Sequence, residues 1–199
     1  IGAAATGLVA LVSGSLGWAI LKQSLIGTAR TTAMIFFIVL GAGFYNGFLA
    51  LSGVPQFMAD WVVGQGLRPW LVLTIILVFY LILGCLMDSL SMILLVIPFF
   101  WPVLVELNGG LYAFGPDTGF GMSTEDLKVW FGILALIVVE LGLITPPVGM
   151  NVFVISALAK DVPMIETFKG VMPFFGAEIV RITVLIMFPA LVLWLPSVL

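Results

Sequence analysis

Residues 140–151 read ELGLITPPVGMN, and this stretch decides how the rest of the chain is interpreted. It lies inside an apolar run, residues 129–159, that is about as long as a helix needs to be to cross a bilayer. Proline has no backbone N–H and pushes the preceding residue out of helical geometry, so Pro146 and Pro147 predict a break in this helix. The carbonyl groups of residues 141–145 therefore lose their helical partners, and hydrocarbon cannot replace them.

A broken helix at this depth is stable only against protein or against a polar cavity. Many secondary transporters hold a cation and an anionic substrate at such a break, near the middle of the membrane. The alternative is a proline kink that packs against neighbouring helices and binds nothing. A buried carboxyl at Glu140 and the hydroxyl of Thr145, with glycines at 142 and 149, favour the binding site.

The composition places the chain in the class of polytopic helical membrane proteins. Hydrophobic residues make up 62% of the 199 residues and charged residues only 9%, a balance that soluble domains do not reach. The sequence has no histidine, which excludes histidine-dependent triads, metal ligands and proton relays. Its one cysteine, Cys85, excludes a disulfide within the chain. The opening residues IGAAATG resemble no signal peptide, and we expect a fragment of a longer protein.

The N-terminal third predicts two spans and one interfacial helix. Residues 1–21 form the first apolar segment, residues 22–30 a short basic connection, and residues 31–51 the second span. Asn46 is the one strongly polar side chain in the second span, and an interhelical hydrogen bond is favoured for it over a ligand role. Residues 53–67 have apolar positions at helical spacing but are too short to span, which predicts an amphipathic interfacial helix anchored by Trp61.

Residues 69–105 form a long apolar stretch that only GCLMDSLS, residues 84–91, interrupts. One interpretation is a full span followed by a tight turn outside the membrane. The other, which we favour, is a re-entrant helical hairpin whose polar tip stops at membrane depth and faces protein or a water-filled cavity. Asp88 at this tip can bind a ligand, or it can simply cap the second arm of the hairpin.

The C-terminal half continues with a polar loop, the broken helix and a last span. Ser123 is spaced from Asp126 as in a capping box, which predicts a helix N-terminus at the end of the polar loop of residues 106–128. Residues 161–169 predict a second short amphipathic piece, and residues 170–199 contain the last span. Glu178 and Arg181 lie on one helical face, and we expect them to pair structurally.

The basic residues predict the orientation. Lys22 and Arg30 lie in one connection, and Lys160 and Lys169 lie in another. Both connections fall on the same side of the membrane whether residues 69–105 form a hairpin or two full crossings, and the positive-inside rule makes that side cytoplasmic.

Four stretches together resemble a known family: TARTTAMIFFIVLGAGF, GVPQFMADWV, LGCLMDSLSMILLVIPFFWPVL and ELGLITPPVGMNVFVISALA. They are similar to the C-terminal half of the large membrane subunit of TRAP (tripartite ATP-independent periplasmic) transporters. The similarity runs over essentially the whole chain, and GLITPPVG with its downstream Asn is the most specific part.

The resemblance implies an all-α polytopic membrane protein, one repeat of an elevator-type transporter with a re-entrant hairpin and a broken helix. It implies no enzyme activity but Na⁺-coupled import of an organic acid, such as a C4-dicarboxylate or a sialic acid, across the bacterial inner membrane. Na⁺ is the coupling ion, and no other cofactor is expected. The expected partners are a small membrane subunit and a periplasmic substrate-binding protein, with no nucleic acid.

The resemblance also divides the chain. The expected parts are scaffold helices with the interfacial helix over residues 1–67, the hairpin over 68–105, an external loop over 106–127, the broken helix over 128–160, and an amphipathic arm with the last scaffold helix over 161–199. The hairpin and the broken helix together form the expected transport domain.

If the hairpin tip and the helix break meet in space, their oxygens suit a hard cation, because carbonyl and hydroxyl ligands add no net charge. The expected Na⁺ ligands are Gly84, Asp88, Gly142, Thr145 and Val148. The N-terminus of the helix after the break carries a partial positive charge that suits a carboxylate. The expected substrate-binding residues are Ser89, Ser91, Pro147, Gly149 and Asn151. Glu140 is either a coupling carboxyl or a buried structural one.

Three classes of membrane protein other than a transporter are compatible with an apolar helical chain. A channel subunit would need a filter or a ring-forming repeat, and the sequence shows neither. An intramembrane protease would need an aspartate pair, for which only Asp88 and Glu140 are available. A structural membrane subunit without coupled transport is the third.

Overall fold

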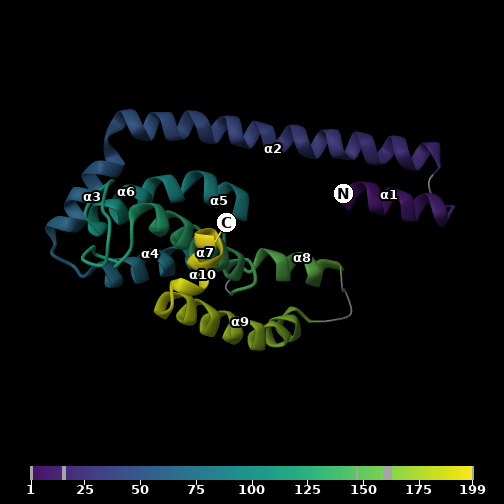
Figure 1. Ribbon diagram of the computed structural model, residues 1–199. Coiled ribbons are helices and arrows are strands. Elements are labelled where there is room, and N and C mark those ends of the chain that lie inside the picture. Colours follow the sequence, from purple (N-terminus) through teal and green to yellow (C-terminus); the bar gives the residue numbers. More distant parts are fainter. Residues whose placement is uncertain (1, 15–16, 147, 159–162, 199) are drawn as a thin grey trace. The chain divides into compact units, whose positions relative to one another are not determined.

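The computed structural model describes residues 2–14, 17–146, 148–158 and 163–198. Within these ranges all regular secondary structure is helical, in helices α1 to α10 (Figure 1). The expectation of an all-α chain is thus confirmed for the described residues. The chain falls into two compact units, residues 1–44 and residues 45–199, which are described separately.

The first unit contains α1 (Gly2–Val12) and most of α2 (Trp18–Ser52). The expected first span over residues 1–21 is therefore interrupted, with Gly14 at a φ of 68° between the two helices. The expected basic connection over residues 22–30 is wrong, because α2 runs through it without a break. Residues 22–30 contain no proline and a single glycine, so nothing in this stretch stops a helix.

The second unit begins with the end of α2 and with α3 (Val54–Gly64), which confirms the predicted short helix. Gly53 separates the two helices with a φ of 68°, in the left-handed region that favours glycine. Asn46, near the end of α2, donates from Nδ2 to the carbonyl oxygen of Leu94 at 3.1 Å. The predicted interhelical hydrogen bond is therefore confirmed.

The long apolar stretch forms α4 (Pro69–Gly84) and a second arm made of α5 (Ser89–Leu95) and α6 (Ile97–Asn108). Both interpretations of this stretch require two arms joined by a turn, and the re-entrant depth of the hairpin stays a prediction. Figure 1 shows the second arm running back along α4 toward α3. The second arm is bent by 50° between α5 and α6, which the sequence analysis did not anticipate. Pro98 lies just after the bend and removes one helical N–H there, which is an ordinary cause of a kink.

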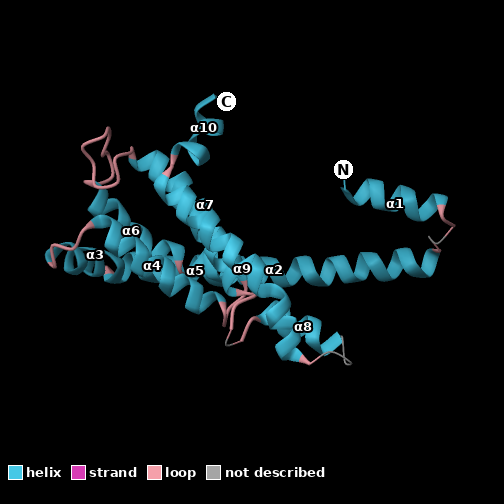
Figure 2. Cartoon of the chain, turned by 90° about the horizontal axis from the view of Figure 1, so that it is seen from below, coloured by secondary structure: helices cyan, strands magenta, loops and turns pink. Residues whose placement is uncertain are grey.

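The loop of residues 109–123 leads into α7 (Thr124–Gly142). The predicted capping interaction is confirmed, because the backbone N–H of Asp126 donates to Ser123 Oγ at 3.1 Å. Figure 2 shows this loop at one end of α7 and the break between α7 and α8 at the other.

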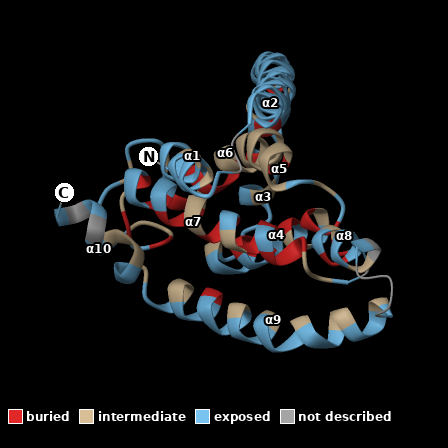
Figure 3. Cartoon of the chain, turned by 90° about the vertical axis from the view of Figure 1, so that its right-hand side faces the viewer, coloured by how far each residue is buried: buried red, intermediate tan, exposed pale blue. Residues whose placement is uncertain are grey.

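The core of the second unit lies between α4, α6 and α7, and α4 packs most extensively against α7. Figure 3 shows buried residues concentrated along α4 and α7, whereas α9 is exposed along most of its length. Trp130 on α7 is fully buried, and its Nε1 donates to the carbonyl oxygen of Leu185 on α9 at 2.9 Å. The hairpin and the long helix before the break thus form one packed body.

The remaining helices are α8 (Met150–Leu158), α9 (Met164–Met187) and α10 (Ala190–Val198). The expected amphipathic piece over residues 161–169 is not separate, because Lys169 lies within the continuous helix α9; Lys160 and Asp161 lie outside the described residues. The expected last span is divided by the end of α9. Glu178 and Arg181 pair as predicted, with 2.6 Å between Oε2 and Nη2.

Two of the described helices, α2 and α9, are long and apolar enough to cross a membrane. The bent pair α5 and α6 makes a third candidate if it forms one span. These candidates rest on length and composition and support the predicted membrane protein.

Candidate functional site

The hairpin tip is the turn of residues 85–88, between α4 and α5. Asp88 is the N-cap of α5, and its Oδ2 accepts a hydrogen bond from the backbone N–H of Ser91 at 3.0 Å. The capping role that the sequence left open is therefore present. The Asp88 side chain is exposed, and Ser89 and Ser91 are half-buried at the start of α5.

The predicted break in the long helix is confirmed. α7 ends at Gly142 and α8 begins at Met150, with Pro146 between them. Pro147, expected to bind substrate, lies outside the described residues. Gly149 has a φ of 55°, in the left-handed region that favours glycine, and a Cβ there would also lie only 3.0 Å from Cε1 of Phe168 on α9.

The tip and the break meet in space, as expected, and two glycines make the contact. A Cβ on Gly142 would lie 2.7 Å from the Cα of Gly84, and one on Gly84 would lie 2.9 Å from the carbonyl oxygen of Val139. Next to this contact the thiol of Cys85 lies 3.8 Å from the carbonyl oxygen of Pro146. The C-terminal ends of α4 and α7 therefore approach backbone to backbone, which brings two interrupted helices to one place.

Several of the carbonyl groups that the break was expected to free have found other donors. The carbonyl oxygen of Leu141 accepts from the backbone N–H of Ile144 at 3.2 Å and from Thr145 Oγ1 at 2.6 Å. The carbonyl oxygen of Gly142 accepts from the backbone N–H of Thr145 at 3.0 Å. The first residues of the break thus fold back on the end of α7.

The start of α8 supplies another donor, since the backbone N–H of Asn151 donates to the carbonyl oxygen of Leu143 at 3.0 Å. This N–H was expected to face a substrate carboxylate, and it is occupied within the chain. Among the described residues, the carbonyl groups of Ile144 and Thr145 accept no hydrogen bond. The carbonyl group of Val148 also has no donor among these residues, so three described oxygens at the break remain available.

The other expected site residues lie on open surface. Glu140, expected to be buried, is exposed on α7, and Val148 and the Asn151 side chain are also exposed. The described chain therefore brings the tip and the break together without enclosing a ligand between them. Groups of three or more acidic or cysteine side chains able to hold a metal ion are absent from the described residues.

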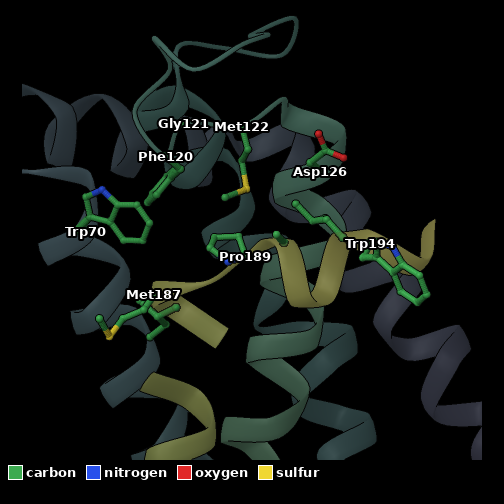
Figure 4. Close-up of a pocket in the computed structure, with 11 residues that line it drawn as sticks. Trp70, Phe120, Gly121, Met122, Asp126, Met187, Pro189 and Trp194 are labelled. Atoms are coloured by element: carbon green, nitrogen blue, oxygen red, sulfur yellow. The ribbon is translucent and has the colours of Figure 1, made fainter. Parts of the chain in front are cut away.

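A cavity of about 660 Å³ opens at the opposite end of α7, next to the loop of residues 109–123. Figure 4 shows Trp70 and Phe120 on one side of it, Pro189 in the middle, and Asp126 and Trp194 on the other side. Its walls are mainly apolar and aromatic, and none of the expected site residues lines it. The cavity is therefore distinct from the predicted site.

Asn108, which no local sequence pattern singled out, is fully buried at the end of α6. Its Nδ2 donates to the carbonyl oxygen of Met122 at 3.1 Å, and its Oδ1 accepts from the backbone N–H of Phe120 at 3.2 Å. A polar residue at the end of an apolar helix, directly before Gly109 and Gly110, was the signal available for it. Its role is to hold the loop against the helical body.

The sequence profile of one protein family, described as "Tripartite ATP-independent periplasmic transporter, DctM component", matches residues 1–191. No solved structure gives a significant match.

Among curated proteins, the chain is 32% identical over 173 residues to the C4-dicarboxylate TRAP transporter large permease protein DctM of Pseudomonas aeruginosa. It is 29% identical over 170 residues to the sialic acid TRAP transporter large permease protein SiaM of Vibrio cholerae. These matches cover 87% and 85% of this chain, and 36% of each relative. The chain thus spans about a third of the length of the relatives that it matches.

Proposed function

Because the chain belongs to the DctM family of tripartite ATP-independent periplasmic transporters, we propose that it forms part of a membrane permease that imports an organic acid. The relatives are named for C4-dicarboxylates and for sialic acid, which share a carboxylate group. The proposed substrate is therefore a small carboxylate. The whole permease acts in the bacterial inner membrane, with a small membrane subunit and a periplasmic protein that delivers the substrate.

The observation that carries this proposal is the backbone contact between Gly84 and Gly142. It joins a polar hairpin tip to a helix break, the arrangement in which secondary transporters place an ion and a substrate. In a chain with 62% hydrophobic residues, two such interruptions at one place would be costly without a ligand or a polar surface to satisfy them.

We propose that Na⁺ is the coupling ion and that it binds on the break side of this contact. The carbonyl oxygens of Ile144 and Thr145 have no donor among the described residues, and a hard cation needs oxygen ligands of this kind. Thr145 Oγ1 donates its proton to Leu141, so its lone pairs remain able to face a cation. The Asp88 carboxylate at the tip adds the negative charge that a cation favours.

The substrate carboxylate is proposed to bind beside the cation, near Ser89 and Ser91 at the start of α5 and Gly149 at the start of α8. α8 begins directly after the helix break, so its N-terminus contributes partial positive charge. In this arrangement the cation offsets the charge of the substrate, which couples the binding of one to that of the other.

The test uses the full-length permease with its small subunit in proteoliposomes. Radiolabelled succinate and sialic acid are added with their loaded binding proteins, under an inward Na⁺ gradient or a matched K⁺ gradient. We expect uptake of one substrate only with the Na⁺ gradient and only with a binding protein. Equal uptake in K⁺ would refute the coupling, and no uptake of either acid would favour a structural subunit.

A further inference from the structure

Pro98 leaves one carbonyl group of the hairpin without its helical partner. In an uninterrupted helix the carbonyl oxygen of Leu94 would accept the N–H of residue 98, and proline has none. The next two N–H groups, of Phe99 and Phe100, donate to the carbonyl oxygen of Val96 at 3.2 and 3.3 Å. The bend of 50° between α5 and α6 lies at this point.

Asn46 supplies the missing donor from another helix. Its Nδ2 lies 3.1 Å from the carbonyl oxygen of Leu94, across 48 residues of sequence. A carbonyl group can only accept, so the amide must turn its NH₂ group toward Leu94. Asn46 Oδ1 is buried and has no hydrogen-bond partner among the described residues, so the bond to Leu94 sets the side-chain orientation.

Side-chain packing does not fill the space beside this bond. A cavity of about 250 Å³ is lined by Asn46, Gln56, Pro98 and Pro102. The bond therefore lies beside an open pocket and not inside a close-packed region.

The direction of α5 matters because α5 carries the tip. Asp88 caps it, Met92 is fully buried, and α5 packs against both α6 and α7. A change in the bend would move the start of α5 relative to the helix break that follows Gly142.

We propose that Asn46 is a positioning residue for transport: by donating to the Leu94 carbonyl group that Pro98 leaves unpartnered, it fixes the bend that places the hairpin tip against the helix break. The effect on transport rests on the proposed function. The hydrogen bond to Leu94 and its link to Pro98 do not depend on that function. Asn46 itself contacts neither ion nor substrate.

A double-mutant cycle on the purified full-length permease tests the bond. Asn46→Leu removes the donor, and Pro98→Ala returns a backbone N–H to the helix. We expect Asn46→Leu to lower Tm by about 1–3 °C in the parent and to have little further effect in the Pro98→Ala background. Equal losses in both backgrounds would overturn the proposal. If Asn46→Leu does not fold in either background, Asn46→Ser replaces it in the same cycle.

Uptake measurements test the positioning role. Asn46→Leu should raise the half-saturating Na⁺ concentration by about 2- to 10-fold. The control is Thr74→Val, which removes a hydroxyl that bonds within its own helix, to the Trp70 carbonyl group, and should leave that concentration unchanged. If Asn46→Leu lowers Tm only in the parent background and leaves the half-saturating Na⁺ concentration unchanged, Asn46 has a structural role and does not position the site. If the parent shows no Na⁺-driven uptake, the proposed function fails. The double-mutant cycle on Tm still shows whether Asn46 and Pro98 are linked through the Leu94 carbonyl group.

Discussion

At Gly84 and Gly142 the candidate site depends on residues that have no side chain. Neither glycine has a positive φ, so backbone conformation does not require them. What requires them is space, because a Cβ on Gly142 would lie 2.7 Å from the Cα and 2.8 Å from the carbonyl carbon of Gly84. Backbone atoms cannot move aside as the end of a flexible side chain can.

We therefore predict that Gly142→Ala separates α4 from α7 at the tip. The expected result is a loss of most uptake and a fall in stability of about 1–3 kcal/mol, the usual range for overpacking. Uptake in proteoliposomes and Tm in detergent measure the two effects.

Gly132→Ala on the same helix is the matched control, because a Cβ there meets nothing within 4 Å. Alanine is also the better helix former, by about 1 kcal/mol. Gly132→Ala should be neutral or stabilising, and equal damage from both substitutions would mean that the close contact is not the cause.

A second prediction at the residue scale concerns Thr145. Thr145→Val keeps the shape of the side chain and removes one oxygen from the proposed cation site. We expect a higher half-saturating Na⁺ concentration for uptake, and Thr145→Ser, which keeps the hydroxyl, should remain close to the parent. An unchanged Na⁺ dependence in Thr145→Val would exclude the side chain as a ligand and leave only the carbonyl oxygens.

At the scale of elements, Asn108 joins the loop of residues 109–123 to the helical body. Its amide bonds to backbone groups of Met122 and Phe120, and Thr124 Oγ1 donates to the carbonyl oxygen of Gly110 at 2.9 Å. Loops without regular structure lose order readily when such buried bonds are removed.

Asn108→Leu should therefore leave the backbone N–H of Phe120 without a partner, whereas the carbonyl oxygen of Met122 keeps the hydroxyl of Thr118 as a donor. We expect stability to fall by about 1–3 kcal/mol, the cost of one buried unpaired group. The measurements are Tm and the rate of limited proteolysis within residues 109–123. Asp117→Asn, at an exposed position in the same loop, is the control and should change neither. If the loop of Asn108→Leu is cleaved no faster than the loop of this control, other contacts hold the loop in place.

The hairpin carries a further prediction, that its tip is re-entrant and enters the membrane from the non-cytoplasmic side. With Cys85 replaced by Ser, a cysteine at Ser89 should react with an impermeant maleimide added outside, as a cysteine at Glu125 should. A cysteine at Lys169 should react only from the cytoplasmic side. Reaction of Ser89→Cys only from the cytoplasmic side would mean that residues 69–87 cross the whole membrane.

At the scale of the whole molecule, the hairpin and the broken helix share one buried core. Leu73, Tyr80 and Leu104 from the hairpin and Trp130 and Leu134 from α7 are all buried in it. Separating these elements would expose the core and both polar interruptions to lipid, at several kcal/mol for each unpaired polar group. The physical expectation is that they move as one rigid body.

This predicts the outcome of crosslinking in the full-length permease after Cys85 is replaced. A link between Leu90→Cys on the hairpin and Phe44→Cys on α2 should stop uptake, because an elevator movement would have to break the bond from Asn46 on α2 to Leu94 during each cycle, and the link prevents that separation. A link between Phe79→Cys and Phe100→Cys, whose rings lie 5.5 Å apart within the hairpin, should leave uptake intact. Full uptake with the first link formed would contradict an elevator movement of these parts.

Much of the fold follows from local chemistry and was predicted from the sequence alone. The break after Gly142 follows from prolines that lack an N–H, the cap of α7 from the hydroxyl of Ser123, and the hairpin turn from a short polar interruption between apolar arms. Each of these features depends on residues within about one helical turn of each other, so the sequence itself contains the cause.

The tertiary structure decided which of these local features meet and how their polar groups are paired. The contact of Gly84 with Gly142, the bond of Asn46 to Leu94 and the pairing of Asn108 with Met122 join residues far apart in the chain. Local rules assign no partner to such groups, because the partner depends on which helices pack together. The same packing gave some of the described carbonyl groups at the break a donor and left others, such as those of Ile144 and Thr145, without one, and that division underlies the proposed site.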